Sequence, residues 1–388
     1  MNDLERFLAI VNFQEPDYYP VFGMRGAPGF SAGCQRPAHD RLRVGGMPEW
    51  VGGTYKDGAF VGVETWEKYW GTTGAIYVDF WPARNFPEPL KYKRLIEGGF
   101  EFVECETGAR TKQVLDNDNT YSMPEFQAYD VRDRASWEYY KGRTECTGVW
   151  TQAEIDEACK QFDNRDKPLC VNVAGTYGVV RSLMGTELAS VMLYDDPELV
   201  HDIIDTFDRR NRTFLFPLIE RLKPEIIATG EDICYNHGLL LSPAHFREFC
   251  SPLYKAAAEC AIASGVKMRA CDCDGNVMQF VELLDECGFN ALFPFEVKAG
   301  NDLMQVREKL PSFIMFGGLE KEVVNEGNEG MIEPEIMTKV PPLLHKGGYF
   351  PNQDHGIQPY ITFGNLCKFM TILHELCGNP EGMYPKTR

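Results

Sequence analysis

The sequence predicts an α/β fold, a (β/α)8 barrel of the TIM type with an N-terminal extension and a β-hairpin insertion. Beyond about residue 150, short apolar runs alternate with longer segments of helical period, as βαβ units require. Six such runs follow residue 165 and two more precede it, which matches the eight strands of a closed parallel barrel. The alternative is an open doubly wound sheet. No G-x-G-x-x-G segment follows the first strand to support the dinucleotide-binding form of that sheet.

The expected strands and helices follow in order along the chain. The first two strands are expected at residues 20–24 and 75–80. Residues 197–221 have helical period, and another helix begins near Ser242, which can cap it, with Pro243 in the first turn. The six later strands are expected at 169–175, 225–230, 266–271, 290–296, 313–318 and 348–351.

A hairpin signature interrupts the early part of the chain. Residues 99–104 alternate apolar and polar side chains, Thr107-Gly108 suits a turn, and a second strand resumes at residues 111–114. This pattern predicts a β-hairpin insertion near residues 98–116.

We expect residues 1–388 to form a single barrel domain, with the main βα repeats in 151–388 and an aromatic-rich part in 1–150. The aromatic residues of that part supply material for a flat pocket, although at least half of them should belong to the core or to dimer contacts. They are Tyr18, Tyr19, Phe22, Trp66, Trp70, Tyr77, Phe80 and Trp81.

The composition excludes several classes of partner. The chain has 39 Lys and Arg against 57 Asp and Glu, a net charge of −18, so the phosphate backbone of a nucleic acid would be repelled. No secretion signal and no apolar run of membrane-spanning length is present, so we expect a cytoplasmic protein that does not bind a membrane. The 13 cysteines are scattered and are expected to be reduced, which fits an anaerobic cell.

Acidic, imidazole and amide side chains follow the carboxyl ends of the expected strands. Catalytic groups of a parallel barrel lie at this end, so these side chains are the candidates for chemistry. They are Glu231, Asp232, Tyr235, Asn236 and His237 after one strand, then Asp272 and Asp274, then Glu296, and finally Asn352, Asp354 and His355.

Two of these acids have the spacing of a metal site. Asp272 and Asp274 are two residues apart, so on a strand they would point to one side, while Cys271 and Cys273 would point to the other. With a His and a Glu from neighbouring strands they could bind Zn²⁺. The alternative is a turn held by Asx hydrogen bonds, which the Gly-Asn pair at 275–276 would suit.

The same strand ends carry a resemblance to the uroporphyrinogen decarboxylase superfamily, over roughly residues 125–378. This resemblance implies a (β/α)8 barrel. The motifs that carry it are Gly230-Glu231-Asp232, Ser242-Pro243-x-x-Phe246-Arg247-Glu248-Phe249-x-x-Pro252, Asp272-x-Asp274-Gly275-Asn276, Phe293-Pro294-x-Glu296, Gly317-Gly318-x-x-Lys321 and Gly347-Gly348-Tyr349-x-Pro351-x-x-Asp354-His355.

The superfamily includes cofactor-free decarboxylases and zinc-dependent methyltransferases that exchange methyl groups with a corrinoid protein. Decarboxylases of this kind bind substrate carboxylates with an Arg-rich N-terminal segment, of which only Arg25 is present here. The methyltransferases have a His-x-Cys pair and a later Cys as ligands. Aligned on those positions, this chain has Asp272, Asp274 and His355, which favours a metal acting as a Lewis acid over a thiol-activating zinc.

The resemblance therefore predicts a corrinoid-dependent methyltransferase, an O-demethylase component that moves a methyl group from a small donor, a phenyl methyl ether, to cob(I)alamin on a corrinoid-binding protein. The expected cofactors are Zn²⁺ and the partner's corrinoid, and a homodimer is left open. A divalent ion held by Asp272, His355, and Glu231 or Glu296 would stabilise the departing oxygen. The assigned residues are Glu231, Tyr235, His237 and Asp354 for catalysis, Arg25, Tyr177, Asn236 and Asn352 for substrate binding, and Asp272, Asp274, Glu296 and His355 for the metal.

Three alternatives stay open. The enzyme could transfer methyl from a methylcorrinoid to a folate or a thiol, or it could be a cofactor-free decarboxylase. A non-catalytic ligand-binding barrel is less favoured, because unpaired carboxylates at the strand ends are costly without a use.

Overall fold

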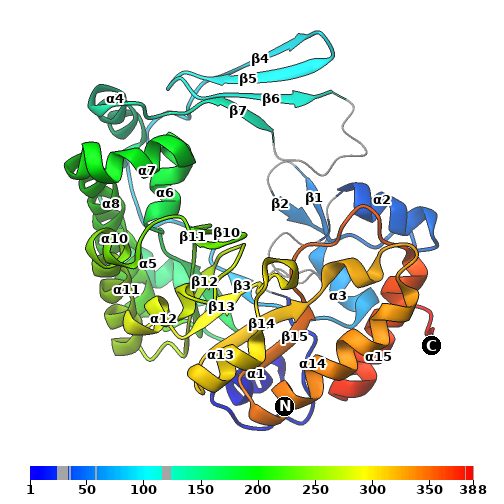
Figure 1. Ribbon diagram of the computed structural model, residues 1–388. Helices are drawn as coiled ribbons and strands as arrows, with labels where there is room; N and C mark the ends of the chain where they lie inside the picture. Colours follow the sequence, from blue (N-terminus) through cyan, green and yellow to red (C-terminus); the bar gives the residue numbers. More distant parts are fainter. Residues whose placement is uncertain (24–33, 35, 57–58, 116–123, 381, 388) are drawn as a thin grey trace.

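A curled parallel sheet surrounded by helices forms the centre of the molecule (Figure 1). The computed structural model describes residues 1–388 except 24–33, 35, 57–58, 116–123, 381 and 388. The sheet has seven described strands in the order β15-β14-β13-β12-β9-β8-β3, and every neighbouring pair is parallel. Their bounds are β3 Ile76–Tyr77, β8 Leu169–Asn172, β9 Ile226–Gly230, β12 Met268–Asp272, β13 Ala291–Phe293, β14 Ile314–Leu319 and β15 Tyr349–Gln353.

The eighth place in the barrel is taken by the segment around Phe22. Phe22 forms an isolated parallel bridge with Thr73, just before β3, and Thr73 N donates to Val21 O at 3.1 Å. On the other side, the Asn352 side chain of β15 donates to Phe22 O at 3.1 Å. The (β/α)8 prediction is therefore confirmed, although the first expected strand is reduced to this bridge.

The interior of the barrel is filled by apolar side chains from alternate strand positions. Phe316 and Phe350 stack there with ring centroids 4.2 Å apart. Helix α1 (Asp3–Val11) closes the end at which the strands begin, because Leu4 N donates to Asp166 O, shortly before β8, at 2.7 Å. Phe7 of α1 packs against Phe350 in the barrel core, so the opposite end is the open one.

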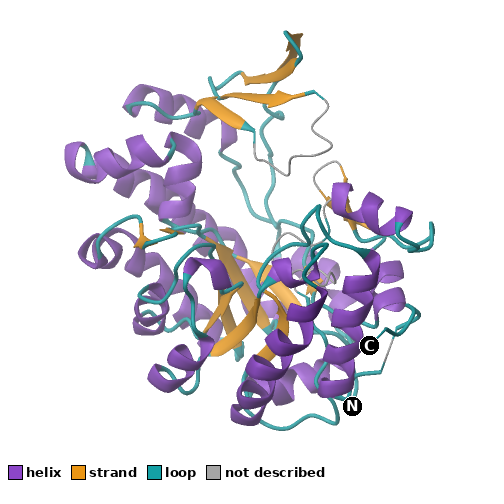
Figure 2. Cartoon of the chain, turned by 45° about the vertical axis from the view of Figure 1, so that its right-hand side comes forward, coloured by secondary structure: helices purple, strands orange, loops and turns teal. Residues whose placement is uncertain are grey.

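Helices cover the outside of the barrel (Figure 2). They bury the outward side chains of the strands in a second, larger apolar cluster. The α-helices after β8 are α6 Tyr177–Met184, α7 Thr186–Asp195, α8 Pro197–Arg210, α9 Phe216–Leu222, α10 Pro243–His245, α11 Ser251–Ala263, α12 Phe280–Glu286, α13 Leu303–Lys309, α14 Ile332–Lys346 and α15 Phe363–Cys377. Single-turn 3-10 helices are η1 Lys160–Phe162, η4 Val297–Ala299, η5 Lys321–Val324 and η6 Glu329–Met331.

Two π-helical turns interrupt these helices, and the sequence explains both. The predicted helix over 197–221 is continuous through η2 (Asn211–Leu215), and the helix that begins at Ser242 contains η3 (Phe246–Cys250). Pro217 and Pro252 follow the two turns. Proline has no N–H for the regular α-helical hydrogen bond, so a wider turn at this place relieves the mismatch.

A four-stranded antiparallel sheet lies beside α4 at the top of the view in Figure 1, away from the barrel. The predicted hairpin is present as β5 (Phe100–Cys105) and β6 (Arg110–Val114). Strands β4 (Tyr92–Glu97) and β7 (Glu125–Ala128) flank it and were not predicted, because most of their side chains are exposed and their apolar residues do not alternate regularly.

The remaining described elements lie in the first 160 residues and at one strand end. They are α2 Arg36–Val44, β1 Thr54–Lys56, β2 Ala59–Val61, α3 Val63–Trp70, α4 Arg134–Thr144 and α5 Gln152–Cys159, with the short hairpin β10 Cys234–Tyr235 and β11 Gly238–Leu239 after β9. Among the described residues, no helix is both long enough and apolar enough to cross a membrane.

Candidate functional site

Three of the predicted residues come together at the open end of the barrel. Asp274 follows β12, Glu296 follows β13 and His355 follows β15, and each offers a ligand atom that lies within 4.8 Å of the other two. Because carboxyl ends of parallel strands meet at one end of the barrel, three distant parts of the chain supply this cluster. Asp272, the fourth assigned ligand, is not brought into it.

Asp274 and His355 face each other directly. His355 Nε2 lies 3.5 Å from Asp274 Oδ2, while Asp274 Oδ1 and His355 Nδ1 are buried atoms that have no hydrogen-bond partner among the described residues. Burial alone would raise the pKa of Asp274, but the hydrogen bond from His355 and the charges of His355, Lys321 and Arg181 hold the pKa below its usual value. Asp274 is therefore a carboxylate with one coordination position to spare.

Glu296 completes the cluster and is held from two sides. Phe295, buried and at φ +58°, turns the chain so that Glu296 lies next to the β12 loop. Gly275 N donates to Glu296 Oε2 at 2.9 Å, and Lys321 Nζ lies 2.7 Å from Glu296 Oε1. The cluster thus contains a lysine ammonium beside its acids.

The Gly-Asn turn after Asp274 is built without the Asp274 carboxylate. Gly275 has φ +84°, and a Cβ there would lie 2.9 Å from backbone atoms of Tyr235. Asn276 N donates to Tyr235 O at 2.9 Å, and the Asn276 side chain bonds to Met278 N and Ala299 O. The Asx turn is therefore present, but Asn276 forms it, which leaves Asp274 available for the cluster.

Asp354 lies beside the cluster and holds its supporting loops. Its carboxylate accepts from Val297 N at 2.7 Å and from Lys321 N at 2.9 Å. Burial raises the pKa of Asp354 to about 6, although these two hydrogen bonds act to lower it. Both carboxylate oxygens are engaged with backbone amides, so this residue positions Lys321 and the loop after Glu296.

Glu231 lies beneath the surface of the barrel end. It is 2% exposed, and its carboxylate accepts from Thr176 Oγ1 at 2.6 Å, from Gly178 N at 2.7 Å and from Thr176 N. Burial raises the pKa of Glu231. Next to it, Asp232 pairs with Arg181 at 3.0 Å. Glu231 thus fixes the amino end of α6 and does not reach the cluster.

The other assigned residues lie in three different settings. Tyr235, Asn236 and His237 are exposed on the β10–β11 hairpin, whereas Tyr177 is buried in the outer layer with its hydroxyl 3.0 Å from Ser190 Oγ. Asn352 is fully buried in the barrel, where it bonds to Phe22. The assigned residue at position 25 lies outside the described residues.

The cysteines beside the metal candidates point away from the cluster. Cys271 and Cys273 are buried in the outer apolar layer, as the strand alternation predicts, and Cys271 Sγ lies 3.7 Å from Tyr254 OH. Burial raises the pKa of both thiols well above the ordinary value. Neither is a thiolate ligand in this arrangement.

Lys321 and Arg181 are the functional candidates that sequence reasoning did not assign. Lys321 stands in the quoted Gly317-Gly318-x-x-Lys321 motif, at the end of β14, so its position after a strand was the available signal. Arg181 lies in the interior of α6 and had no such signal.

Comparisons with known proteins agree with this architecture. A model of the uroporphyrinogen decarboxylase (URO-D) family matches residues 132–376. Among solved structures, a methyltransferase from Methanosarcina mazei is similar, with a TM-score of 0.56 and 15% sequence identity over 97% of this chain and 99% of that one. A search of curated proteins gives no match.

Proposed function

The chain belongs to the uroporphyrinogen decarboxylase family, and from this membership we propose that it is a methyltransferase that moves a methyl group from a phenyl methyl ether to the cob(I)alamin of a corrinoid protein. The cluster of Asp274, Glu296 and His355 at the open end of the barrel is the observation that carries the proposal. The similar fold of a protein described as a methyltransferase supports the same branch of the family.

The three residues of the cluster fit a divalent metal ion such as Zn²⁺. They offer two carboxylates and one imidazole, which are ordinary zinc ligands, and Asp274 Oδ1, which has no hydrogen-bond partner among the described residues, would gain one. Asp272 is left out of this ligand set, because the structure does not bring it to the other three residues. When bound, the ion would act as a Lewis acid on the ether oxygen.

The reaction breaks the bond between the methyl carbon and the ether oxygen and forms a bond between that carbon and cobalt. Co(I) supplies the electron pair of the new bond, and the departing phenoxide keeps the pair of the old one. The residues around the cluster would stabilise that negative charge. The Lys321 ammonium adds positive charge beside Glu296, and Tyr235 and His237, exposed on the hairpin above, are proposed to supply the proton.

The position of the cysteines favours an ether donor over transfer to a thiol. A thiol-activating zinc depends on cysteine ligands, and Cys271 and Cys273 face the outer layer of the barrel. The corrinoid partner would approach the open end of the barrel, past the exposed Tyr235.

Lys321 supports a second candidate, a cofactor-free decarboxylase. Its ammonium, which pairs with Glu296 at 2.7 Å, could exchange that partner for a substrate carboxylate at the open end of the barrel, and this needs no metal. The two candidates differ in one measurable respect, because only the methyltransferase proposal requires a metal.

The test is metal analysis of the purified chain together with methyl transfer to cob(I)alamin from a panel of methoxybenzenes. We expect about one zinc per chain and a transfer activity that a chelator removes and added zinc restores. The His355→Ala variant should lose both zinc and activity, with Cys271→Ser as the matched control that keeps both. A fully active protein without metal would contradict the proposal.

A further inference from the structure

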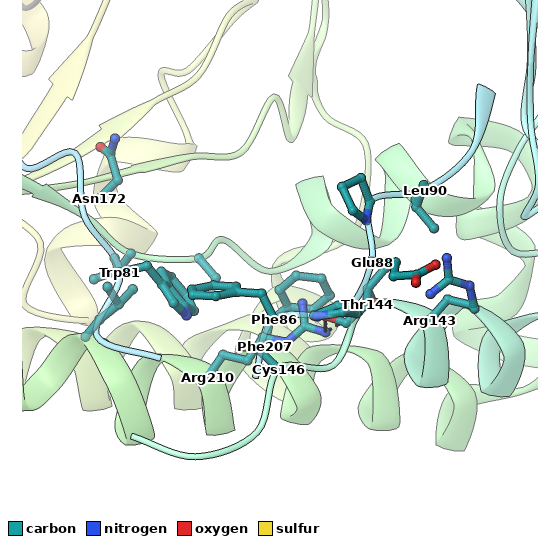
Figure 3. A pocket seen from close by; sticks show the side chains of 15 residues that line it. Trp81, Phe86, Glu88, Leu90, Arg143, Thr144, Cys146, Asn172, Phe207 and Arg210 are labelled. Atoms are coloured by element: carbon teal, nitrogen blue, oxygen red, sulfur yellow. Dashed lines mark hydrogen bonds between the residues drawn. The ribbon is translucent and has the colours of Figure 1, made fainter. Parts of the chain in front are cut away.

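A cavity lies beyond β3 and at the end of β8, two neighbouring strands of the sheet that do not carry the acidic cluster (Figure 3). Its volume is about 540 Å³, within the range of small-molecule sites. The segment after β3, the carboxyl ends of α4 and β8, and helix α8 with η2 enclose it. The lining residues are Trp81, Phe86, Pro87, Glu88, Pro89, Leu90, Arg143, Thr144, Cys146, Asn172, Val173, Ala174, Phe207, Arg210 and Leu215.

Most of the lining is apolar or aromatic. Figure 3 shows Trp81, Phe86 and Phe207 in the middle of the cavity, with Arg143 and Glu88 toward one end and Asn172 at the other. Phe86 is 60% exposed, which is unusual for so large an apolar side chain. A ligand with a flat apolar body would cover this ring.

Arg210 places a positive charge in that apolar setting. Its guanidinium carbon lies 4.6 Å from the centroid of the Phe207 ring, and Nη2 donates only weakly to Thr144, at 3.3 Å to Oγ1 and 3.5 Å to O. Among the described residues, no carboxylate lies within ion-pair distance of Arg210. A guanidinium has five N–H donors in a planar fork that matches a carboxylate. Since Thr144 takes only one weak pair of these bonds, most of the hydrogen-bonding capacity of Arg210 is unused.

The other charges of the lining do not take this role. Arg143 is neutralised by an ion pair with Glu106. Glu88 is exposed at the edge of the cavity, where water screens its charge. Arg210 is therefore the cation that a ligand would meet against the aromatic wall.

The wall next to Arg210 is rigid. Asn211, the next residue, is fully buried in the π-helical turn, and its side chain bonds to Ala174 N at 2.9 Å and to Ala174 O at 3.4 Å. These bonds connect the end of β8 to the helix, so the two sides of the cavity are held at a fixed separation. π-Helical turns of this kind occur frequently at functional sites.

We propose that this cavity is a binding site for a small molecule with a planar apolar body and one carboxylate group, with Arg210 as the partner of the carboxylate and Trp81, Phe86 and Phe207 as the surface for the body. The site is separate from the acidic cluster, because β9 lies between β8 and β12 in the sheet. The proposal for this cavity does not depend on the proposed methyltransferase function.

The test is isothermal titration calorimetry of the full chain with 3-phenylpropanoate and with its neutral analogue 3-phenylpropanamide. We expect saturable binding of one molecule of the acid per chain, with a dissociation constant in the millimolar range or below. The amide should bind at least about tenfold more weakly, because it lacks the charge that pairs with the guanidinium. Equal binding of acid and amide, or no saturable binding of the acid, would overturn the proposal.

Variants of two neighbouring arginines locate the binding. Arg210→Met should weaken the acid at least about tenfold and leave the amide nearly unchanged, and Arg210→Lys should have an intermediate effect because it keeps the charge but loses the fork. Arg209 is exposed, bonds to Thr206 at 2.8 Å and does not line the cavity, so Arg209→Met is the matched control. If both variants weaken the acid equally, the general charge of α8 and not the cavity is responsible, and the assignment of Arg210 is wrong.

Zinc content gives the independent measurement. Arg210→Met should bind as much zinc as the wild-type chain, because the two sites are separate. Loss of zinc in this variant would contradict the separation of the sites, whereas loss of acid binding alone would leave the methyltransferase proposal untouched.

Discussion

His355 Nε2 lies 3.5 Å from Asp274 Oδ2, so the residue after the last strand of the barrel meets the loop after the fifth. This contact depends on the curling of the sheet into a barrel, because β13 and β14 lie between β12 and β15 in the sheet. The other polar atom of each side chain, His355 Nδ1 and Asp274 Oδ1, has no hydrogen-bond partner in the part of the chain that the structure describes. A cation bound beside Asp274 would give Oδ1 a partner, and His355 would contribute Nε2, the ring nitrogen that faces Asp274.

One substitution at each position can distinguish the roles of Asp274 and Asp272 in metal binding. Asp274→Asn should lower bound zinc well below the wild-type content, because an amide is a poorer ligand than a carboxylate and the pairing with His355 is weakened. Asp272→Asn should keep most of the zinc, since Asp272 is not in the cluster. Metal analysis after dialysis measures both. If Asp272→Asn loses more zinc than Asp274→Asn, then Asp272 and not Asp274 is the metal ligand.

Lys321 competes with a metal ion for Glu296. Its ammonium lies 2.7 Å from Glu296 Oε1, so binding of a cation there must displace or tolerate this charge. Lys321→Met should raise the affinity for zinc by roughly tenfold, which corresponds to about 1.4 kcal/mol. Titration against a zinc-binding dye gives the dissociation constants.

Lys298 provides the control for that experiment. It is an exposed lysine that pairs with Glu322 and lies outside the cluster, so Lys298→Met removes the same charge from a neighbouring loop. An equal gain in zinc affinity for both variants would show a general electrostatic effect, and the specific competition at Glu296 would be disproved.

Cys271→Ser and Cys273→Ser should keep the metal and lose stability. Both thiols are at most 1% exposed in the outer apolar layer, where a hydroxyl would be harder to satisfy than a thiol. We expect each variant to unfold at lower denaturant concentration, by about 1–3 kcal/mol, with unchanged zinc content. Loss of zinc at unchanged stability would place sulfur among the ligands.

The alternation of strand residues predicted much of this arrangement. The outward direction of Cys271 in β12 and of Cys273 just after it follows from the two-residue period of a strand. The positions of the seven described strands, and of the bridge at Phe22 that takes the eighth place, follow from apolar runs, and the hairpin follows from its turn residues. These are local features, and local patterns carry the information needed to predict them.

What the sequence could not predict depends on contacts between distant segments. Asp272 and Asp274 are equivalent by spacing, but Asp272 is the last residue of β12, whereas Asp274 lies in the loop beyond it, where it joins the cluster. Glu231 follows a strand like the other acids, yet it is buried under the amino end of α6 because Thr176 and Gly178 are brought to it by β8. The cavity beside Arg210 likewise needs four segments that have no sequence signal in common.

Glu231 makes the stability of the protein depend on pH. Burial raises its pKa in the folded chain above the ordinary value of 4.5, so between these two values the folded state holds a proton that the unfolded state has lost. The contribution of Glu231 to stability is therefore fully present below about pH 4.5 and is lost as the pH rises through the raised pKa.

Glu231→Gln removes this titration, and it also leaves one of the donors from Thr176 and Gly178 facing an amide nitrogen. We expect the variant to be less stable by about 1–3 kcal/mol at low pH and to approach the wild type as the pH rises. Urea unfolding at a series of pH values measures the difference, and a difference that grows with pH would show that Glu231 is buried in its charged form with a lowered pKa.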